Sequence, residues 1–250
     1  MKKQLFFLMA IIFAIQGFTQ TTVTIGSGTT GVNTLPIGSY YNYSYTQQIY
    51  TAAEIGAQTG VITSIGFEYI YASSMTVNNV KVFIGNTSNT TFATTSSWIP
   101  TSSMQEVYNG SITFQNGWVF ITLDNYYQWD NISNLVVCVI NGNGDYEGSQ
   151  NRFNVHTNPG GQGSLYTQND YNPYSSTTSP TSGTISANRN NIKFIFDTPP
   201  TCPAPTALQA SNPTSSPTSF NLSWTDASGT LWNIQYMPAA QIDWANATTI

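Results

Sequence analysis

Asn134-Leu135-Val136-Val137-Cys138-Val139-Ile140 is the stretch that decides the fold of this 250-residue chain. After its first residue the stretch is continuously apolar, and it is dominated by Val and Ile, which favour strands. A strand with one solvated face alternates apolar and polar residues, whereas a continuous apolar run is typical of a strand covered on both faces. We therefore expect these residues to form a central strand of a β domain.

Other β-rich runs surround this stretch, separated by clusters of Gly, Asn, Ser and Thr. The clearest are residues 61–69, 79–85, 118–123 and 192–197. The best helix candidate, residues 51–55, is only about one turn long, and residues 169–186 have the composition of a long surface loop. This spacing predicts an all-β fold, an antiparallel and jelly-roll-like β-sandwich.

The composition excludes several other classes of protein. Charged residues make up 7% of the chain, against roughly 25% in an ordinary soluble domain. Lys and Arg number 6 against 11 Asp and Glu, so no basic field is present to bind a phosphate backbone, and nucleic acid is not an expected partner. The residues that build helical bundles are scarce, while an aromatic share of 14% supplies a core and argues against disorder.

The N-terminus has the pattern of a secretory signal peptide, which we assign to residues 1–20. Lys2 and Lys3 precede an apolar run over residues 5–15, and small and polar residues follow it. A run this short does not reach the roughly 20 residues that span a bilayer, so no membrane span is expected. The sequence therefore predicts an acidic protein that is secreted or displayed on the cell surface.

A proline-rich segment divides the rest of the chain. Residues 199–205 read Pro-Pro-Thr-Cys-Pro-Ala-Pro, a stiff connector that cannot continue a central strand. We expect an N-terminal β-sandwich domain over residues 21–198, a linker over 199–205 and a second domain over 206–250.

The second domain resembles the first half of a fibronectin type III domain. Pro205 stands where that family opens, Trp224 stands at its core Trp, and Trp232, Ile234 and Tyr236 follow the pattern of its third strand. Such a domain needs roughly 100 residues. The resemblance therefore implies a partial immunoglobulin-like sandwich, with the remaining strands beyond Ile250.

The N-terminal domain resembles the Tyr-rich modules that precede Cys-Pro-x-Pro and a type III unit in secreted proteins of Bacteroidetes-type bacteria. Residues 39–50, 82–87, 134–137 and 189–192 carry this second resemblance. It implies display at the outer surface of the cell.

The chain has two cysteines, Cys138 and Cys202. An exported protein permits a disulfide between them, which would join the central strand to the linker. In the alternative, Cys138 is a small buried hydrophobic residue, and the type III resemblance implies that Cys202 pairs with a partner beyond Ile250.

Catalysis finds little support in the sequence, and we expect a protein that is not an enzyme. The only His, His156, lies in a strand-like run, and the chain contains no Gly-x-Ser-x-Gly nucleophile elbow. Paired carboxylates are the chemistry of glycoside hydrolysis, but sequence spacing cannot show that any two acids face each other. The candidate acids are Glu54, Glu68, Glu106, Asp124, Asp130, Asp145, Glu147 and Asp170.

A Gly- and Asn-rich segment follows the central strand. Residues 141–147 alternate glycines with oxygen-bearing side chains, as a flexible calcium loop requires. The candidate calcium ligands are Asn141, Asn143, Asp145 and Glu147. The alternative is an ordinary Gly/Asn hairpin turn after a buried strand.

Aromatic residues are the candidates for ligand contact. A strand through residues 40–50 places Tyr41, Tyr43 and Tyr45 on one face, where they either pack a sandwich or form a platform for sugar rings. Trp98 and Trp129 lie next to loops, where an indole N–H needs a partner.

These features together favour a non-enzymatic, adhesin-like surface module. It would bind a glycan or a cell-surface protein, with the type III unit as a spacer. Low charge suits a neutral glycan, which is recognised by stacking and by hydrogen bonds. The alternative is an accessory region of a secreted multi-domain hydrolase whose catalytic domain lies outside this sequence.

Overall fold

The computed structural model describes residues 20–197, 206–211, 221–225, 235–236 and 248–249. The chain divides into two compact units, Met1–Pro199 and Pro200–Ile250. The predicted signal peptide, apart from residue 20, the predicted linker and Cys202 lie outside the described residues. No helix in the described part of the chain is long and apolar enough to cross a membrane.

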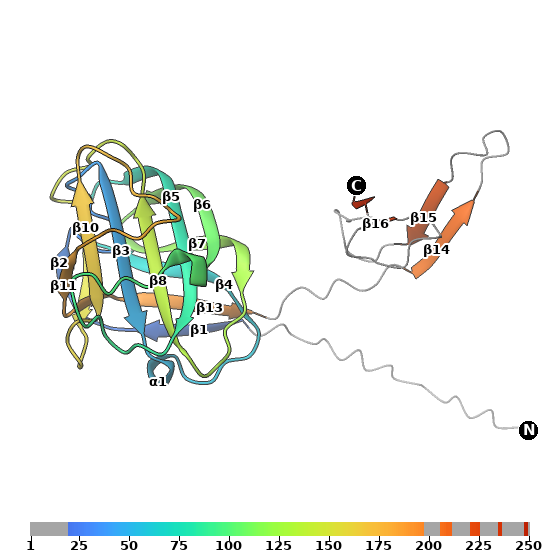
Figure 1. The fold of residues 1–250 in the computed structure, drawn as a ribbon, viewed down its shortest axis with the longest axis horizontal. Coiled ribbons are helices and arrows are strands. Elements are labelled where there is room, and N and C mark those ends of the chain that lie inside the picture. The colour runs from blue at the N-terminus through green and yellow to red at the C-terminus, as the bar shows by residue number, and fades with distance from the viewer. Residues whose placement is uncertain (1–19, 198–205, 212–220, 226–234, 237–247, 250) are drawn as a thin grey trace, which may run out of the picture. The chain divides into compact units, whose positions relative to one another are not determined.

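The N-terminal unit contains two antiparallel sheets, as the sequence predicts (Figure 1). The first sheet has β1 (Thr21–Ile25), β13 (Ile192–Asp197), β4 (Val61–Tyr69), β9 (Phe153–Thr157) and β12 (Asn188–Asn190) in that order, with β7 (Gly117–Tyr127) paired to β4 and β2 (Thr30–Val32) paired to β9. The second sheet has the order β11 (Thr184–Ser186), β10 (Ser164–Asn169), β3 (Tyr43–Tyr50), β8 (Asn134–Asn141), β5 (Met75–Thr87) and β6 (Gln105–Phe114). The predicted central strand is β8, which lies between β3 and β5.

Strand β8 is covered on both faces, which explains its continuous apolar sequence. Leu135, Val137 and Val139 belong to the inner core, the buried cluster that lies between the two sheets. The alternate residues Val136, Cys138 and Ile140 belong to the outer core, on the opposite face of the second sheet. The other members of the outer core are Tyr45, Ile49, Phe83, Phe92, Trp98, Ile99 and Leu165.

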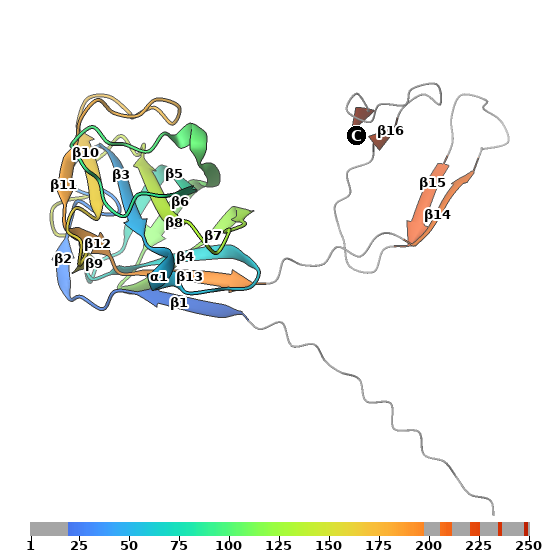
Figure 2. The same ribbon diagram turned by 60° about the horizontal axis from the view of Figure 1, so that its bottom comes forward.

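Two long loops cover the outer core. One runs from the end of β5 to β6 and includes the short 3-10 helix Thr101–Ser103, and the other joins β10 to β11 (Figure 2). They are tied together, because the Thr101 hydroxyl donates to the Ser176 carbonyl at 2.8 Å and the Gly183 N–H donates to the Thr95 carbonyl at 2.7 Å. The segment predicted as a surface loop thus also forms one wall of a core, and Tyr174 within it packs inward.

The single predicted helical turn is α1 (Ala52–Ile55). Its start is a capping box: the Thr51 side chain accepts a hydrogen bond from the Glu54 N–H, and the Glu54 carboxylate accepts one from the Thr51 N–H. This cap fixes the position of the Glu54 carboxylate at the end of β3.

In the C-terminal unit, β14 (Thr206–Ser211) pairs antiparallel with β15 (Asn221–Thr225), and β16 (Gln235–Tyr236) pairs with β17 (Thr248–Thr249). All four strands lie within the segment that resembles a type III domain. The resemblance itself stays a prediction.

Candidate binding surface

Three of the aromatic residues considered for ligand contact are buried in the structure, and for Tyr45 this agrees with the packing alternative. The exposed fraction is 0% for Tyr45, 8% for Trp98 and 2% for Trp129. Tyr45 and Trp98 pack edge to face in the outer core, with ring centroids 5.0 Å apart. Trp129 lies in the inner core, and its indole N–H donates to the Ser133 carbonyl at 2.9 Å, so its own loop supplies the partner.

The predicted tyrosine stripe is also interrupted. Strand β3 begins only at Tyr43, so Tyr40 and Tyr41 lie in the preceding turn and do not extend a strand face. Tyr41 and Tyr43 are half-buried, whereas Tyr40, which was not among the predicted ligand residues, is 52% exposed. The role of Tyr41 and Tyr43 in binding stays a prediction.

Tyr40 meets a second exposed tyrosine from a distant part of the chain. Tyr146, in the loop that follows β8, is 59% exposed, and its ring centroid lies 6.1 Å from that of Tyr40 at an interplanar angle of 74°. The rings of Tyr41 and Tyr40 also pack edge to face, with centroids 5.6 Å apart. We call Tyr40, Tyr146 and the two hollows beside them the tyrosine surface.

The two hollows share both exposed tyrosines. The larger has a volume of about 310 Å³ and the smaller about 240 Å³. Besides Tyr40 and Tyr146, the larger is lined by Tyr71, Glu147, Gly148, Ser149, Gln150 and Asn151, and the smaller by Asn42 and Asp170. Aromatic rings, side-chain amides and carboxylates are therefore gathered at one place on the protein surface.

Hydrogen bonds to and from Ser39 hold the tyrosine surface in place. Buried Ser39 donates through its hydroxyl to the carbonyls of Gly148 and Asn151 at 3.1 and 2.8 Å. In return the Ser39 carbonyl accepts from the N–H groups of Glu147 and Gly148 at 2.9 and 3.0 Å. The turn that carries Tyr40 and the loop that carries Tyr146 are thus joined at their bases.

Sequence reasoning missed the pairing of Tyr146 with Tyr40 because the two residues lie more than a hundred positions apart in the chain. The available signal was a large aromatic side chain inside a Gly- and Asn-rich turn, where nothing in the local pattern buries it.

The predicted calcium ligands form hydrogen bonds within their own loop. Asn141 Oδ1 accepts from the Asn143 N–H and Asp145 Oδ1 from the Tyr146 N–H, both at 2.9 Å. Asn143 Nδ2 donates to Glu147 Oε1 at 3.0 Å. This is the arrangement of a turn, and residues 20–197 contain no group of three or more His, Cys, Asp or Glu placed to hold a metal ion. Calcium binding here stays a prediction.

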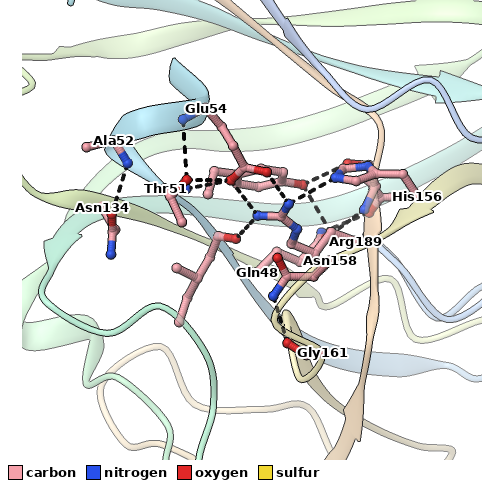
Figure 3. Close-up of polar contacts among 12 residues, drawn as sticks. Gln48, Thr51, Ala52, Glu54, Asn134, His156, Asn158, Gly161 and Arg189 are labelled. Carbon is pink, nitrogen blue, oxygen red and sulfur yellow. Dashed lines mark hydrogen bonds and ion pairs between the residues drawn. The ribbon is translucent and has the colours of Figure 1, made fainter. Parts of the chain in front are cut away.

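A second polar cluster lies inside the domain and joins two residues that the sequence analysis considered for catalysis. Arg189 is fully buried on β12, directly opposite His156 on β9, and it reaches Glu54 in α1 (Figure 3). Its Nη1 donates to Glu54 Oε2 at 3.0 Å and to the Ile49 carbonyl at 2.6 Å, and its Nη2 lies 3.1 Å from His156 Nε2. Glu54 and His156 therefore both contact the guanidinium of Arg189.

The electrostatics of this cluster follow from its burial. Burial alone raises the pKa of Glu54, but hydrogen bonds from Arg189 and Thr51 outweigh it and lower that pKa to about 2. Burial and then the Arg189 charge lower the pKa of His156 below its ordinary value of 6.5. The cluster thus holds an ion pair beside a neutral imidazole.

Acid is expected to destabilise the domain partly through His156. The pKa of His156 is lower in the folded protein than in the unfolded chain. As the pH falls below about 6.5, the unfolded chain therefore binds a proton at His156 more readily than the folded protein does. The free energy of unfolding that His156 contributes above this pH is then lost. In His156→Gln the free energy of unfolding should fall less between about pH 7 and pH 5 than in the wild type. Urea unfolding at several pH values measures this, and equal pH dependence in both proteins would contradict it. His156 is the only His in the chain, so no other imidazole contributes.

Cys138 is fully buried in the outer core, and this burial raises the pKa of its thiol to about 12. It forms no disulfide within the described residues. The prediction that Cys202 pairs beyond Ile250 lies outside the described residues.

No protein-family model matches the chain, and no curated protein matches it. Among solved structures, it is similar to the crystal structure of the cysteine protease and lectin-like domains of Cwp84, a surface layer associated protein of Clostridium difficile. The match has a TM-score of 0.38 and 14% sequence identity, and it covers 63% of this chain and 33% of that one. The chain thus spans about a third of the length of its structural neighbour, and a likeness of this size assigns no activity.

Proposed function

We propose that this protein is an exported, non-enzymatic surface module that contacts a glycan through the tyrosine surface. The observation that carries the proposal is the pair of exposed rings, Tyr40 and Tyr146, between two hollows that contain side-chain amides. The signal-like N-terminus supports export, and the type III resemblance supports a spacer role for the C-terminal unit.

The chemistry of the tyrosine surface suits a sugar. The face of a tyrosine ring packs against the C–H face of a pyranose, while its hydroxyl and nearby amides exchange hydrogen bonds with sugar hydroxyls. Asn42 and Gln150 line the two hollows and can donate and accept. Because hydrogen bonds from the hydroxyl and the carbonyl of Ser39 hold both loops, little order remains to be imposed when a ligand binds.

The polar cluster around Arg189 is accounted for by a structural role. Both carboxylate oxygens of Glu54 contact Arg189, and the pKa of Glu54 is about 2, so this group cannot serve as an acid near neutral pH. The position of Arg189 explains the cluster as a structural ion pair.

Replacing either exposed tyrosine should weaken glycan binding without unfolding the protein. In Tyr40→Ala and Tyr146→Ala we expect affinity to fall at least tenfold, about 1.4 kcal/mol, because a ring that stacks on the sugar is removed. The measurement is a glycan array with the full chain, followed by titration of the best ligand.

The matched control is Tyr126→Ala, since Tyr126 is 45% exposed and lies on β7, outside the tyrosine surface. Loss of affinity in the control as large as in the two variants would contradict the proposal, as would a folded wild type that binds no glycan.

A further inference from the structure

Each hollow of the tyrosine surface contains one carboxylate. Glu147 lines the larger hollow and Asp170 the smaller, and neither hollow has a Lys, Arg or His in its lining. Tyr40 and Tyr146 line both hollows, so each acid shares its hollow with both rings. A ligand that occupies both hollows would meet one carboxylate in each.

The hydrogen-bond donors that position these two carboxylates are neutral, and neither carboxylate forms an ion pair among the described residues. Glu147 Oε1 accepts from Asn143 Nδ2 at 3.0 Å, and Asp170 Oδ1 accepts from the Asn42 N–H at 3.2 Å. The ion pairs formed among the described residues are Lys81–Glu106 and Arg189–Glu54, and neither involves Glu147 or Asp170. In a chain with only 7% charged residues, two such acids at one aromatic site are notable.

The rings favour the same kind of ligand as the acids. An aromatic face carries negative electrostatic potential and attracts a cation, by about 0.5–1 kcal/mol at an exposed site. Carboxylates within the same hollows add a further attraction for positive charge. The hydroxyls of a neutral sugar can donate hydrogen bonds to the carboxylates, but only a cationic ligand brings a counter-charge to them.

We propose that the glycan bound at the tyrosine surface carries protonated amino groups, as an oligosaccharide of amino sugars with unmodified amines does. One amine faces Glu147, a second faces Asp170, and the sugar rings between them pack on Tyr40 and Tyr146. This proposal rests on the proposed function, whose glycan it assigns to a chemical class.

The test compares two ligands that differ in charge but not in length. Short glucosamine oligomers and their fully N-acetylated counterparts are titrated into the full chain at low salt and at about 0.5 M salt, where the Debye length is only a few ångströms. We expect the amine form to bind at least tenfold more tightly at low salt, and we expect most of this difference to disappear at high salt.

Variants that remove one carboxylate charge at a time test whether Glu147 and Asp170 cause the preference for the amine oligomer. Glu147→Gln and Asp170→Asn keep an oxygen acceptor for Asn143 and for the Asn42 N–H, so the loops are expected to stay in place. Each should weaken amine binding about three- to tenfold, as expected for partly exposed charge pairs, and should leave the acetylated ligand unaffected. Asp124→Asn, which removes an exposed acid from β7, should change neither.

The outcomes separate this inference from the proposed function. Equal binding of the two oligomers, both sensitive to Tyr40→Ala, would overturn the amine assignment and leave the glycan proposal standing. An oligolysine of equal charge that binds as tightly as the amine oligomer would also overturn it, in favour of a basic peptide. If neither oligomer binds and arrays show no other glycan, both proposals fail.

Discussion

Replacing Arg189 by Met should lower the free energy of unfolding of the N-terminal unit by about 3–5 kcal/mol, the range for breaking one side of a buried ion pair. Arg189 has 0% exposure, and its guanidinium binds the Glu54 carboxylate and the Ile49 carbonyl. Met fills similar space but leaves these acceptors without their donor. The loss is measured by urea unfolding at neutral pH.

The size of this loss of stability depends on the Glu54 carboxylate, which has no cationic partner in Arg189→Met. Without the arginine, Glu54 loses the hydrogen bond and the positive charge of Arg189, which lower its pKa, and keeps only the hydrogen bonds from Thr51 against the effect of burial. The double variant Arg189→Met/Glu54→Gln should therefore be more stable than Arg189→Met alone, because no charge is left unpaired.

Arg152→Met is the control for the loss of a positive charge. Arg152 is exposed and immediately precedes the first residue of β9. It should change the unfolding free energy by no more than about 0.5 kcal/mol. Arg189→Met within about 1 kcal/mol of the wild type would contradict the structural role of the cluster.

The sequence was most informative where burial determines residue type. The apolar run 134–140 predicted a strand covered on both faces, and the structure confirms it with two separate cores. It could not predict what covers the second face, because the covering loops are rich in Ser, Thr and Asn and contribute only a few apolar residues, such as Phe92 and Trp98. Burial there comes from long-range packing, which has no local periodicity.

Long-range pairing also explains the errors at the candidate site. The expectation of a continuous strand from residue 40 placed Tyr41, Tyr43 and Tyr45 together, but the turn before β3 separates Tyr41 from Tyr45. The partner of Tyr40 is Tyr146, and the partner of Glu54 is Arg189. Contacts of this kind depend on the register of strands far apart in the chain, which composition and spacing do not specify.

Trp129→Ala should destabilise the domain by about 3–5 kcal/mol, although Trp129 was predicted to face a ligand. The side chain is 2% exposed in the inner core and packs against Phe196, with ring centroids 6.1 Å apart. Truncation leaves a cavity and removes the indole N–H from the Ser133 carbonyl. Thermal and urea unfolding of the full chain measure the loss.

Ile132→Ala is the matched control, because Ile132 lies in the same loop with 82% exposure and should be nearly neutral. Glycan affinity, measured below the unfolding transition of the variant, separates the two roles of an aromatic residue. Trp129→Ala should bind as the wild type does, whereas Tyr40→Ala should lose affinity and keep its stability. A Trp129→Ala protein that is as stable as the wild type but binds no glycan would contradict this prediction. Trp129 would then be a ligand residue, and the tyrosine surface would not account for binding.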